Sequence, residues 1–194
     1  MSLQSHCTPR PSVFAADRRA TVLSLDTFLN GQVNGGEFFE ENYFTSGMVT
    51  LVERAFKHLG GNGAGSSVFL LSQAMGGGKT HSMIALGLLA RKPELRRKVL
   101  GDQDPSPKLG KCRVIGFNGR STDAPGGIWG SLAEQLGKAD QFARYCSPLL
   151  QAPGPEAWKQ LLGADPVILF LDELPPYLEY AVAVPVGNAN LGTV

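Results

Sequence analysis

Cysteine is scarce in this chain, and no part of it is uniformly apolar over a long distance. The three cysteines, Cys7, Cys112 and Cys146, are far apart and form no C-x-x-C pair. We therefore expect reduced thiols rather than a disulfide framework or a structural metal site. The N-terminal sequence MSLQSHCTPRPSVF has no apolar run of signal-peptide length, and nothing approaches the ~18 apolar residues of a membrane helix. These absences predict a cytoplasmic protein that does not engage a membrane.

The chain also has almost no net charge. Its formal charge is +1, so no whole-molecule field attracts nucleic acid or an anionic membrane, and only a local basic patch could do so. Apolar residues make up 43% of the chain and charged residues 18%, which is typical of a globular protein rather than a disordered one. A length of 194 residues suits one domain with its own core.

Apolar periodicity predicts helices that alternate with short strands. Helices are predicted where apolar residues recur at three- and four-residue spacing, in residues 45–59, 80–91, 128–145 and 155–163. Short apolar runs predict buried strands at residues 67–73, 112–118 and 167–173. This alternation predicts an α/β fold, with a mostly parallel sheet and helices on both faces. We expect residues 1–44 to form an N-terminal arm and pre-core segment, and residues 45–194 to form the core.

A glycine-rich loop, SQAMGGGKT, joins the first predicted strand to the following helix. Gly76, Gly77 and Gly78 can adopt backbone angles that turn successive N–H groups toward phosphates at the positive end of the helix. Lys79 supplies a charge for the outer phosphates, and Thr80 supplies a hydroxyl ligand for Mg²⁺. Gly-Lys-[Ser/Thr] alone arises by chance in about 0.1 of chains of this length. The prediction therefore depends on the strand before the loop and the helix after it; the alternative is a glycine-rich turn with a solvated lysine.

One position departs from the usual phosphate-loop pattern G-x-x-x-x-G-K-[ST]. Gln73 stands where that pattern has its first glycine. A non-glycine residue is acceptable there if its φ is negative, so we expect the Gln73 amide either to line the phosphate region or only to brace the turn. The predicted nucleotide-binding residues are Gln73, Ala74, Met75, Gly76, Gly77, Gly78, Lys79, Thr80 and His81. For His81 the alternative is an ordinary position on the helix face.

The apolar run VILFLDE ends in two carboxylates, Asp172 and Glu173. Buried carboxylates are costly unless they are paired or bind a metal, so their position requires an explanation. We expect Asp172 to hold Mg²⁺ together with Thr80, and Glu173 to orient and deprotonate an attacking water. The alternative is that the two residues only end the strand before Pro175 and Pro176.

The combination of MGGGKT with LFLDE resembles the P-loop ATPases of the additional-strand type, most closely the AAA+ class. Three longer stretches, SQAMGGGKTHSMIALGLLA, GRSTDAPGGIWGSLAEQLG and LFLDELPPYLEYAVAVPVGN, resemble an uncharacterised prokaryotic ATPase family known mainly as a domain of unknown function. Its members are often encoded beside DNA adenine methyltransferases. The resemblance extends from about Pro11 to the end of the chain.

This resemblance implies a fold, two cofactors and a general function. The fold would be a three-layer P-loop NTPase core, with ATP and Mg²⁺ as cofactors. The full-length protein would hydrolyse ATP to drive work on DNA or on a protein complex, in phage defence or DNA modification. The implied partners are ATP, further copies of the chain in a homo-oligomer, and DNA or a DNA-methyltransferase system.

The AAA+ likeness also implies roles for single residues. A polar residue at the end of the second strand contacts the catalytic glutamate in that class, and Asn118 has this position; an ordinary turn asparagine is the alternative. Lys79, Asn118 and Glu173 are thus the predicted catalytic residues. Tyr43 and Phe44 are candidates for the adenine pocket, with core packing as the alternative.

The part of an AAA+ module that follows the Asp-Glu strand has no counterpart here. Only 21 residues follow Glu173, too few for a sensor strand, an arginine finger and a helical lid. We therefore expect a core truncated after this strand, incomplete at its C-terminus, and a sheet that lacks a strand beside it. Hydrolysis by this chain alone is expected to be slow or absent. A nucleotide-binding module that acts through association and a phosphotransferase stay open as alternatives, and ATP is preferred because no N/T-K-x-D guanine motif is present.

Two charged segments have less specific interpretations. Arg120 and Asp123 lie in the loop after the second predicted strand, where contact with nucleotide, a neighbour or nucleic acid competes with a mutual surface pair. The basic residues Arg91, Lys92, Arg96, Arg97 and Lys98 are expected to form a solvated helix face, with a weak DNA contact as the alternative.

Overall fold

The computed structural model describes residues 8–9, 14, 23–63, 66–72, 76–120, 124, 126–146, 151–186 and 189–190. The helices are α1 (Leu25–Leu29), α2 (Gly35–Glu41), α3 (Ser46–Leu59), α4 (Lys79–Arg91), α5 (Pro93–Leu100), α6 (Gly127–Gln135), α7 (Ala139–Cys146), α8 (Pro155–Leu162) and α9 (Leu174–Ala183), with a 3₁₀ turn η3 (Gly101–Gln103) after α5. The strands are β1 (Arg113–Asn118), β2 (Val167–Asp172), β3 (Pro185–Val186) and β4 (Ala189–Asn190). The architecture is mixed helix and strand, compatible with the predicted α/β class.

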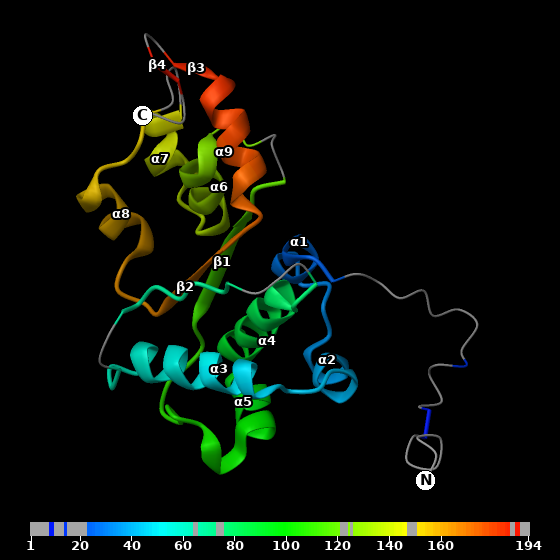
Figure 1. Ribbon diagram of the computed structural model, residues 1–194. Coiled ribbons are helices and arrows are strands. Elements are labelled where there is room, and N and C mark those ends of the chain that lie inside the picture. Colours follow the sequence, from blue (N-terminus) through cyan, green and yellow to red (C-terminus); the bar gives the residue numbers. More distant parts are fainter. Residues whose placement is uncertain are drawn as a thin grey trace.

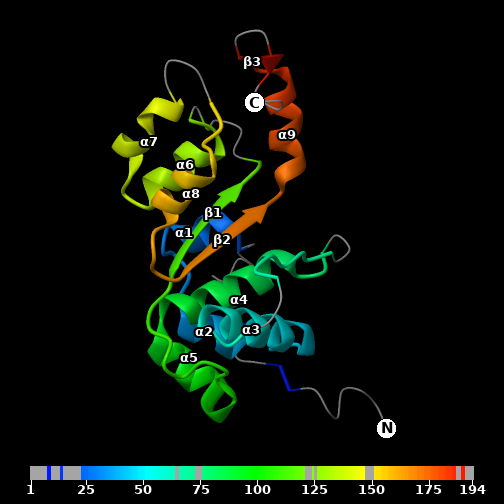
Figure 2. The same ribbon diagram turned by 90° about the vertical axis from the view of Figure 1, so that its left-hand side faces the viewer.

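The centre of the molecule is a parallel pair of strands, β1 and β2. Their register runs from Arg113 opposite Val167 to Asn118 opposite Asp172, so the two carboxyl ends coincide. Figure 2 shows the two arrows side by side and pointing the same way. Successive side chains point to opposite faces: Val114 packs in the cluster that contains α4, whereas Ile115 packs in the cluster that contains α6 and α8. The predicted parallel strands with helices on both faces are confirmed for this pair.

The outer edge of β1 is closed by side chains. The Gln135 side-chain amide pairs with Gly116 like a neighbouring strand: its Oε1 accepts from the Gly116 N–H at 3.0 Å, and its Nε2 donates to the Gly116 carbonyl at 2.7 Å. Arg91 Nη2 donates to the Val114 carbonyl at 3.1 Å. Exposed strand edges tend to pair with other chains, so these bonds protect β1.

The outer edge of β2 has no such cover in the part of the chain that the structure describes. The bonds from Arg113 N–H to Pro166 and from Gly119 N–H to Asp172 show that even-numbered residues of β2 bond to β1. The backbone groups of Leu169 and Leu171 therefore point to the outer edge. These two side chains are also 38% and 44% exposed. The predicted burial of this strand is thus wrong for Leu169 and Leu171, which no described segment fully covers.

The predicted strand at residues 67–73 is wrong for its described residues, 67–72, which adopt no strand. Val68 and Leu70 are 78% and 87% exposed, while Phe69 and Leu71 pack against the cluster around α4. The alternation of a strand is present, but no described segment is hydrogen-bonded beside it as a neighbouring strand. An apolar run indicates that a segment tends to be buried, but it does not indicate whether a partner strand lies beside it.

Most predicted helices are confirmed, with two differences. Thr45 caps α3 by accepting from the Met48 N–H at 3.3 Å, and α4 is almost wholly buried, as its apolar sequence predicts. The single helix predicted at 128–145 is instead two helices, because Gly137 adopts φ 67° between α6 and α7. Helices α1, α2 and α9 were not predicted, although the prolines in the first turn of α9 are compatible with a helix start.

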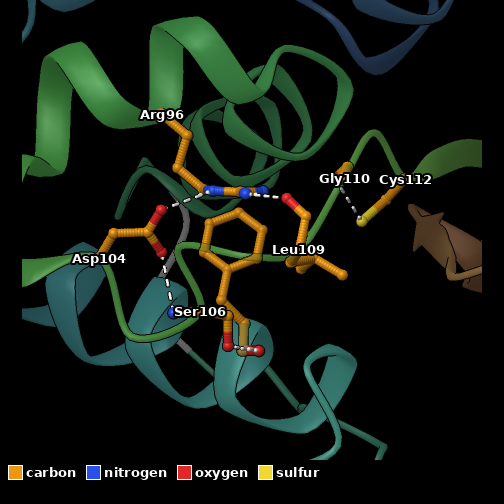
Figure 3. Close-up of polar contacts among 7 residues, drawn as sticks. Arg96, Asp104, Ser106, Leu109, Gly110 and Cys112 are labelled. Atoms are coloured by element: carbon orange, nitrogen blue, oxygen red, sulfur yellow. Dashed lines mark hydrogen bonds and ion pairs between the residues drawn. The ribbon is translucent and has the colours of Figure 1, made fainter.

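The basic segment around α5 is not a uniformly solvated face. Arg96 is 0% exposed, and its Nε donates to Asp104 Oδ2 at 2.9 Å. Figure 3 shows its guanidinium between Asp104 and the Leu109 carbonyl, to which it also donates. Arg91, at the end of α4, donates to the Phe28 carbonyl at 3.0 Å and so ties α1 to the core. The expectation of a solvated face is therefore wrong for Arg96 and in part for Arg91.

The segment before α3 contributes to the main core cluster. Phe28 of α1 and Phe38 of α2 are 1% and 3% exposed, and both belong to the cluster built around α4. A Cβ at Gly87 of α4 would lie 2.4 Å from the Phe28 ring, so the glycine is what allows α1 to lie so close. Figure 1 shows α1 and α2 beside α4. The division of the chain at residues 44 and 45 stays a prediction.

Two of the three cysteines lie in described parts of the chain, and both are free thiols. Burial raises the pKa of the Cys112 thiol, with a smaller opposing effect from the charge of Arg96. Burial also raises the pKa of the Cys146 thiol, reinforced by Glu134. Both groups are therefore poor nucleophiles at neutral pH. Of the helices that the structure describes, none has the length and apolar character required to cross a membrane.

Candidate functional site

Two of the described glycines in the glycine-rich loop have the left-handed backbone conformation that the sequence predicts. Gly76 and Gly78 adopt φ 77° and 78°, in the left-handed region that side chains disfavour. Gly78 immediately precedes α4 as its N-cap residue, so the helix N-terminus has no side-chain cap. The predicted site residues Gln73, Ala74 and Met75 lie outside the described residues.

The first turn of α4 meets the end of β2. Thr80 Oγ1 donates to Asp172 Oδ2 at 2.8 Å, a contact between residues 92 positions apart in the chain. Eight residues of α4, from Met83 to Ala90, are buried, so the core holds this helix firmly in place. Lys79, the first residue of α4, is half-buried. The structure thus brings the two sequence-predicted halves of the site together.

Glu173 has an unusual backbone at the junction between β2 and α9. Its φ of 51° makes it the non-glycine residue with positive φ among the residues that the structure describes. Such a conformation costs on the order of 1 kcal/mol and is retained only where its surroundings impose it. Gly119 belongs to those surroundings: a Cβ there would lie 2.1 Å from the Glu173 carbonyl oxygen. Sequence analysis did not single out Gly119, because this close approach depends on the pairing of β1 with β2.

Asn118 is at the predicted strand end but turns toward α1. Its Nδ2 donates to Asp26 Oδ2 at 2.6 Å. The side-chain contact that the structure gives the Glu173 carboxylate comes instead from Arg120, whose Nη2 lies 3.4 Å from Glu173 Oε1. Arg120 therefore faces the candidate site, whereas Asp123, its predicted alternative partner, lies outside the described residues. Asp26 was not predicted, since no local pattern signals a contact across 92 residues.

His81, Tyr43 and Phe44 are less closely connected with the loop. His81 Nε2 lies 3.2 Å from Asn42 Oδ1, and its ring packs 5.5 Å from that of Phe38. These contacts suit the alternative of a helix-face residue. Tyr43 is 85% exposed, while Phe44 packs against the main core cluster. The adenine-pocket role of both aromatic residues stays a prediction.

A polar cavity of about 480 Å³ lies beside β1, between α1 and α6. Its walls include Asp26, Arg91, Asn118, Glu134 and Gln135, and none of residues 76–80. Burial lowers the pKa of Arg91. The cavity and the glycine-rich loop are therefore different places in the fold, although Asn118 lies near both.

The comparisons with known proteins cover part of the chain. The family model described as the DUF499 N-terminal domain matches residues 32–106, a range that includes the glycine-rich loop and α4 but not β2. This match supports the resemblance to an uncharacterised family over that range. No curated protein and no solved structure matches the chain.

Proposed function

We propose that this chain binds ATP with Mg²⁺ at the glycine-rich loop and forms the core of a P-loop ATPase. The observation that supports this function best is the 2.8 Å bond between Thr80 and Asp172. It joins the hydroxyl of Thr80, the residue after the loop lysine, to the carboxylate of Asp172 at the end of β2. Hydroxyl and carboxylate oxygens are ligands that Mg²⁺ accepts together with phosphate oxygens. The predicted three-layer P-loop fold is part of this proposal.

The residues present fit Mg²⁺ and triphosphate. Among the described residues there is no cluster of three or more His, Cys, Asp or Glu side chains. Mg²⁺ in nucleotide sites needs only one or two protein ligands, because water and phosphates complete its shell, and Thr80 and Asp172 would be those ligands. When bound, the ion would neutralise phosphate charge.

The remaining site residues would contact phosphate or water near Thr80 and Asp172. The N–H groups that follow Gly76 and Gly78 would bind phosphate oxygens, and the α4 N-terminus favours negative charge there. Lys79 would bind the outer phosphates. Glu173 would accept a proton from the attacking water, with its carboxylate oriented by the groups beside it.

A second candidate is a nucleotide-binding module that acts through association without turnover. The open outer edge of β2 favours it, because Leu169 and Leu171 offer backbone groups and partly exposed side chains to an added strand. Work on DNA or with a DNA methyltransferase is supported only by the resemblance of the sequence.

Replacing Asp172 with Asn is expected to remove most of the Mg²⁺ dependence of ATP binding. Asn can still accept from Thr80, so the fold contact persists while the carboxylate charge is lost. We expect Mg²⁺-ATP affinity to fall by about tenfold or more, roughly 1.4 kcal/mol. Calorimetric titration with and without Mg²⁺ measures this directly.

The matched control is Asp102→Asn, which changes an exposed carboxylate in η3 and should bind like wild type. Equal Mg²⁺-ATP affinity in Asp172→Asn and wild type would reject the proposed metal site. Phosphate release in the same samples separates an ATPase from a binding module.

A further inference from the structure

Helix α1 is connected to the end of β1 by a short polar contact. Asp26 lies in the first turn of α1, and its carboxylate accepts from Asn118 Nδ2 at 2.6 Å. The position of α1 is well defined: Leu25 and Phe28 are each 1% exposed in the core, and Ser24 and Thr27 form a capping box at its start. Asp26 thus offers Asn118 a fixed acceptor.

The partners of Asn118 determine which way its amide points. A carboxylate can only accept, so the NH₂ group must face Asp26. A backbone N–H can only donate, so the carbonyl oxygen must face Arg120, whose N–H lies 3.1 Å from Asn118 Oδ1. This second bond spans two residues and closes an Asx turn. Asp26 therefore selects the amide orientation that closes the turn carrying Arg120.

The same turn presents Arg120 to Glu173. Arg120 Nη2 lies 3.4 Å from Glu173 Oε1. The Gly119 N–H donates to the Asp172 carbonyl at 2.8 Å, which places the turn directly against the β2–α9 junction. The two charged side chains are 69% and 46% exposed, so their attraction alone is weak. The backbone turn, rather than the charge pair, must therefore keep the Arg120 side chain beside Glu173.

We propose that Asp26 is a positioning residue for Glu173, acting through the Asn118 amide and the Arg120 side chain. The path begins in α1, at the wall of the 480 Å³ cavity, and ends at the carboxylate of the candidate site. The role in hydrolysis rests on the proposed function. The positioning itself concerns only side chains of this chain and is measurable without nucleotide.

The test is the carbon NMR resonance of the Glu173 side-chain carboxyl group, assigned with a Glu173→Gln sample. Arg120→Gln should move this resonance by removing the adjacent cation. Asp26→Ala should move it in the same direction, by at least about half as much, because the Asx turn loses its fixed amide. Asp26→Asn retains an acceptor oxygen and should leave the resonance near its wild-type position. Asp102→Ala, in an exposed 3₁₀ turn, is the matched control.

Each outcome decides the proposal. A Glu173 resonance that Asp26→Ala leaves unchanged overturns it, as does one that Arg120→Gln leaves unchanged. An equal displacement of the Glu173 resonance in Asp26→Asn and Asp26→Ala also overturns the proposal, because Asp26→Asn keeps the acceptor oxygen and loss of that acceptor would then not explain the displacement. If wild type hydrolyses bound ATP in a single turnover, Asp26→Ala should do so several-fold more slowly at equal Mg²⁺-ATP affinity, and an equal rate would overturn the role in hydrolysis. Failure of wild type to bind Mg²⁺-ATP would reject the proposed function, and the carbon resonance would still decide the positioning.

Discussion

Arg96→Met should lower the free energy of unfolding by about 3–5 kcal/mol, the cost of removing one partner from a buried ion pair. Arg96 and Asp104 have side chains that are 1% and 2% exposed. Without the guanidinium, the Asp104 carboxylate keeps its bond from the Ser106 N–H at 3.0 Å but loses its counter-charge. A domain is stable by only about 5–15 kcal/mol, so this loss is a large part of the total.

The packing around the guanidinium adds to this cost. The Arg96 guanidinium carbon lies 4.9 Å from the centre of the Phe56 ring, and Ser106 Oγ donates to the Phe56 carbonyl at 2.7 Å. Figure 3 shows how these contacts tie α5 to the end of α3 and to the loop before β1. Among the described residues, Arg96 Nη1 is buried without a hydrogen-bond partner, so the loss of this unpaired donor offsets part of the cost.

Urea denaturation of Arg96→Met, with Arg97→Met as control, measures the effect. Arg97 is the exposed neighbour on the same helix, and its substitution should change stability by less than about 0.5 kcal/mol. Equal stabilities of the two variants would mean that the Arg96 cluster does not hold the α5 region in place.

Lys79→Ala should reduce Mg²⁺-ATP affinity by about 10- to 100-fold. Two unit charges about 4 Å apart attract by ~4 kcal/mol at an effective dielectric constant of ~20, and desolvation offsets part of this. Lys79 begins α4 directly after Gly78, whose φ of 78° turns the chain into the helix. A lysine at this position can reach a phosphate bound at the helix N-terminus.

Lys98→Ala provides the matched control, because Lys98 is an exposed lysine of α5. Calorimetry should give this variant the affinity of wild type. The same affinity in Lys79→Ala would show that the loop lysine does not bind phosphate, even if nucleotide binds elsewhere.

The parallel pair and both halves of the candidate site could be predicted from sequence, because each has a local signal. The sequence GGGKT predicts a turn followed by the start of a helix, and the apolar run before Asp172 predicts a strand. Asp172 and Thr80 were expected to hold Mg²⁺ together, so the two residues were expected to lie close to each other. The Thr80–Asp172 contact at 2.8 Å agrees with that expectation.

The rest depended on contacts between distant segments. Whether Arg96 faces solvent or Asp104 is decided by the loop after α5, since five basic residues in one segment look alike in sequence. Residues 67–72 have strand-like alternation without a bonded neighbour, which no local pattern reports. Asn118 was expected to contact Glu173, but its Nδ2 donates to Asp26 of α1 instead.

Amide NMR during titration with Mg²⁺-ATP shows directly whether nucleotide binds at the glycine-rich loop. We expect the largest shifts at the amides of Gly76, Gly77, Gly78, Lys79 and Thr80. Shifts confined to the 480 Å³ cavity, at Gly116, Gly126 and Gly130, would contradict this expectation and place the ligand in the cavity beside β1.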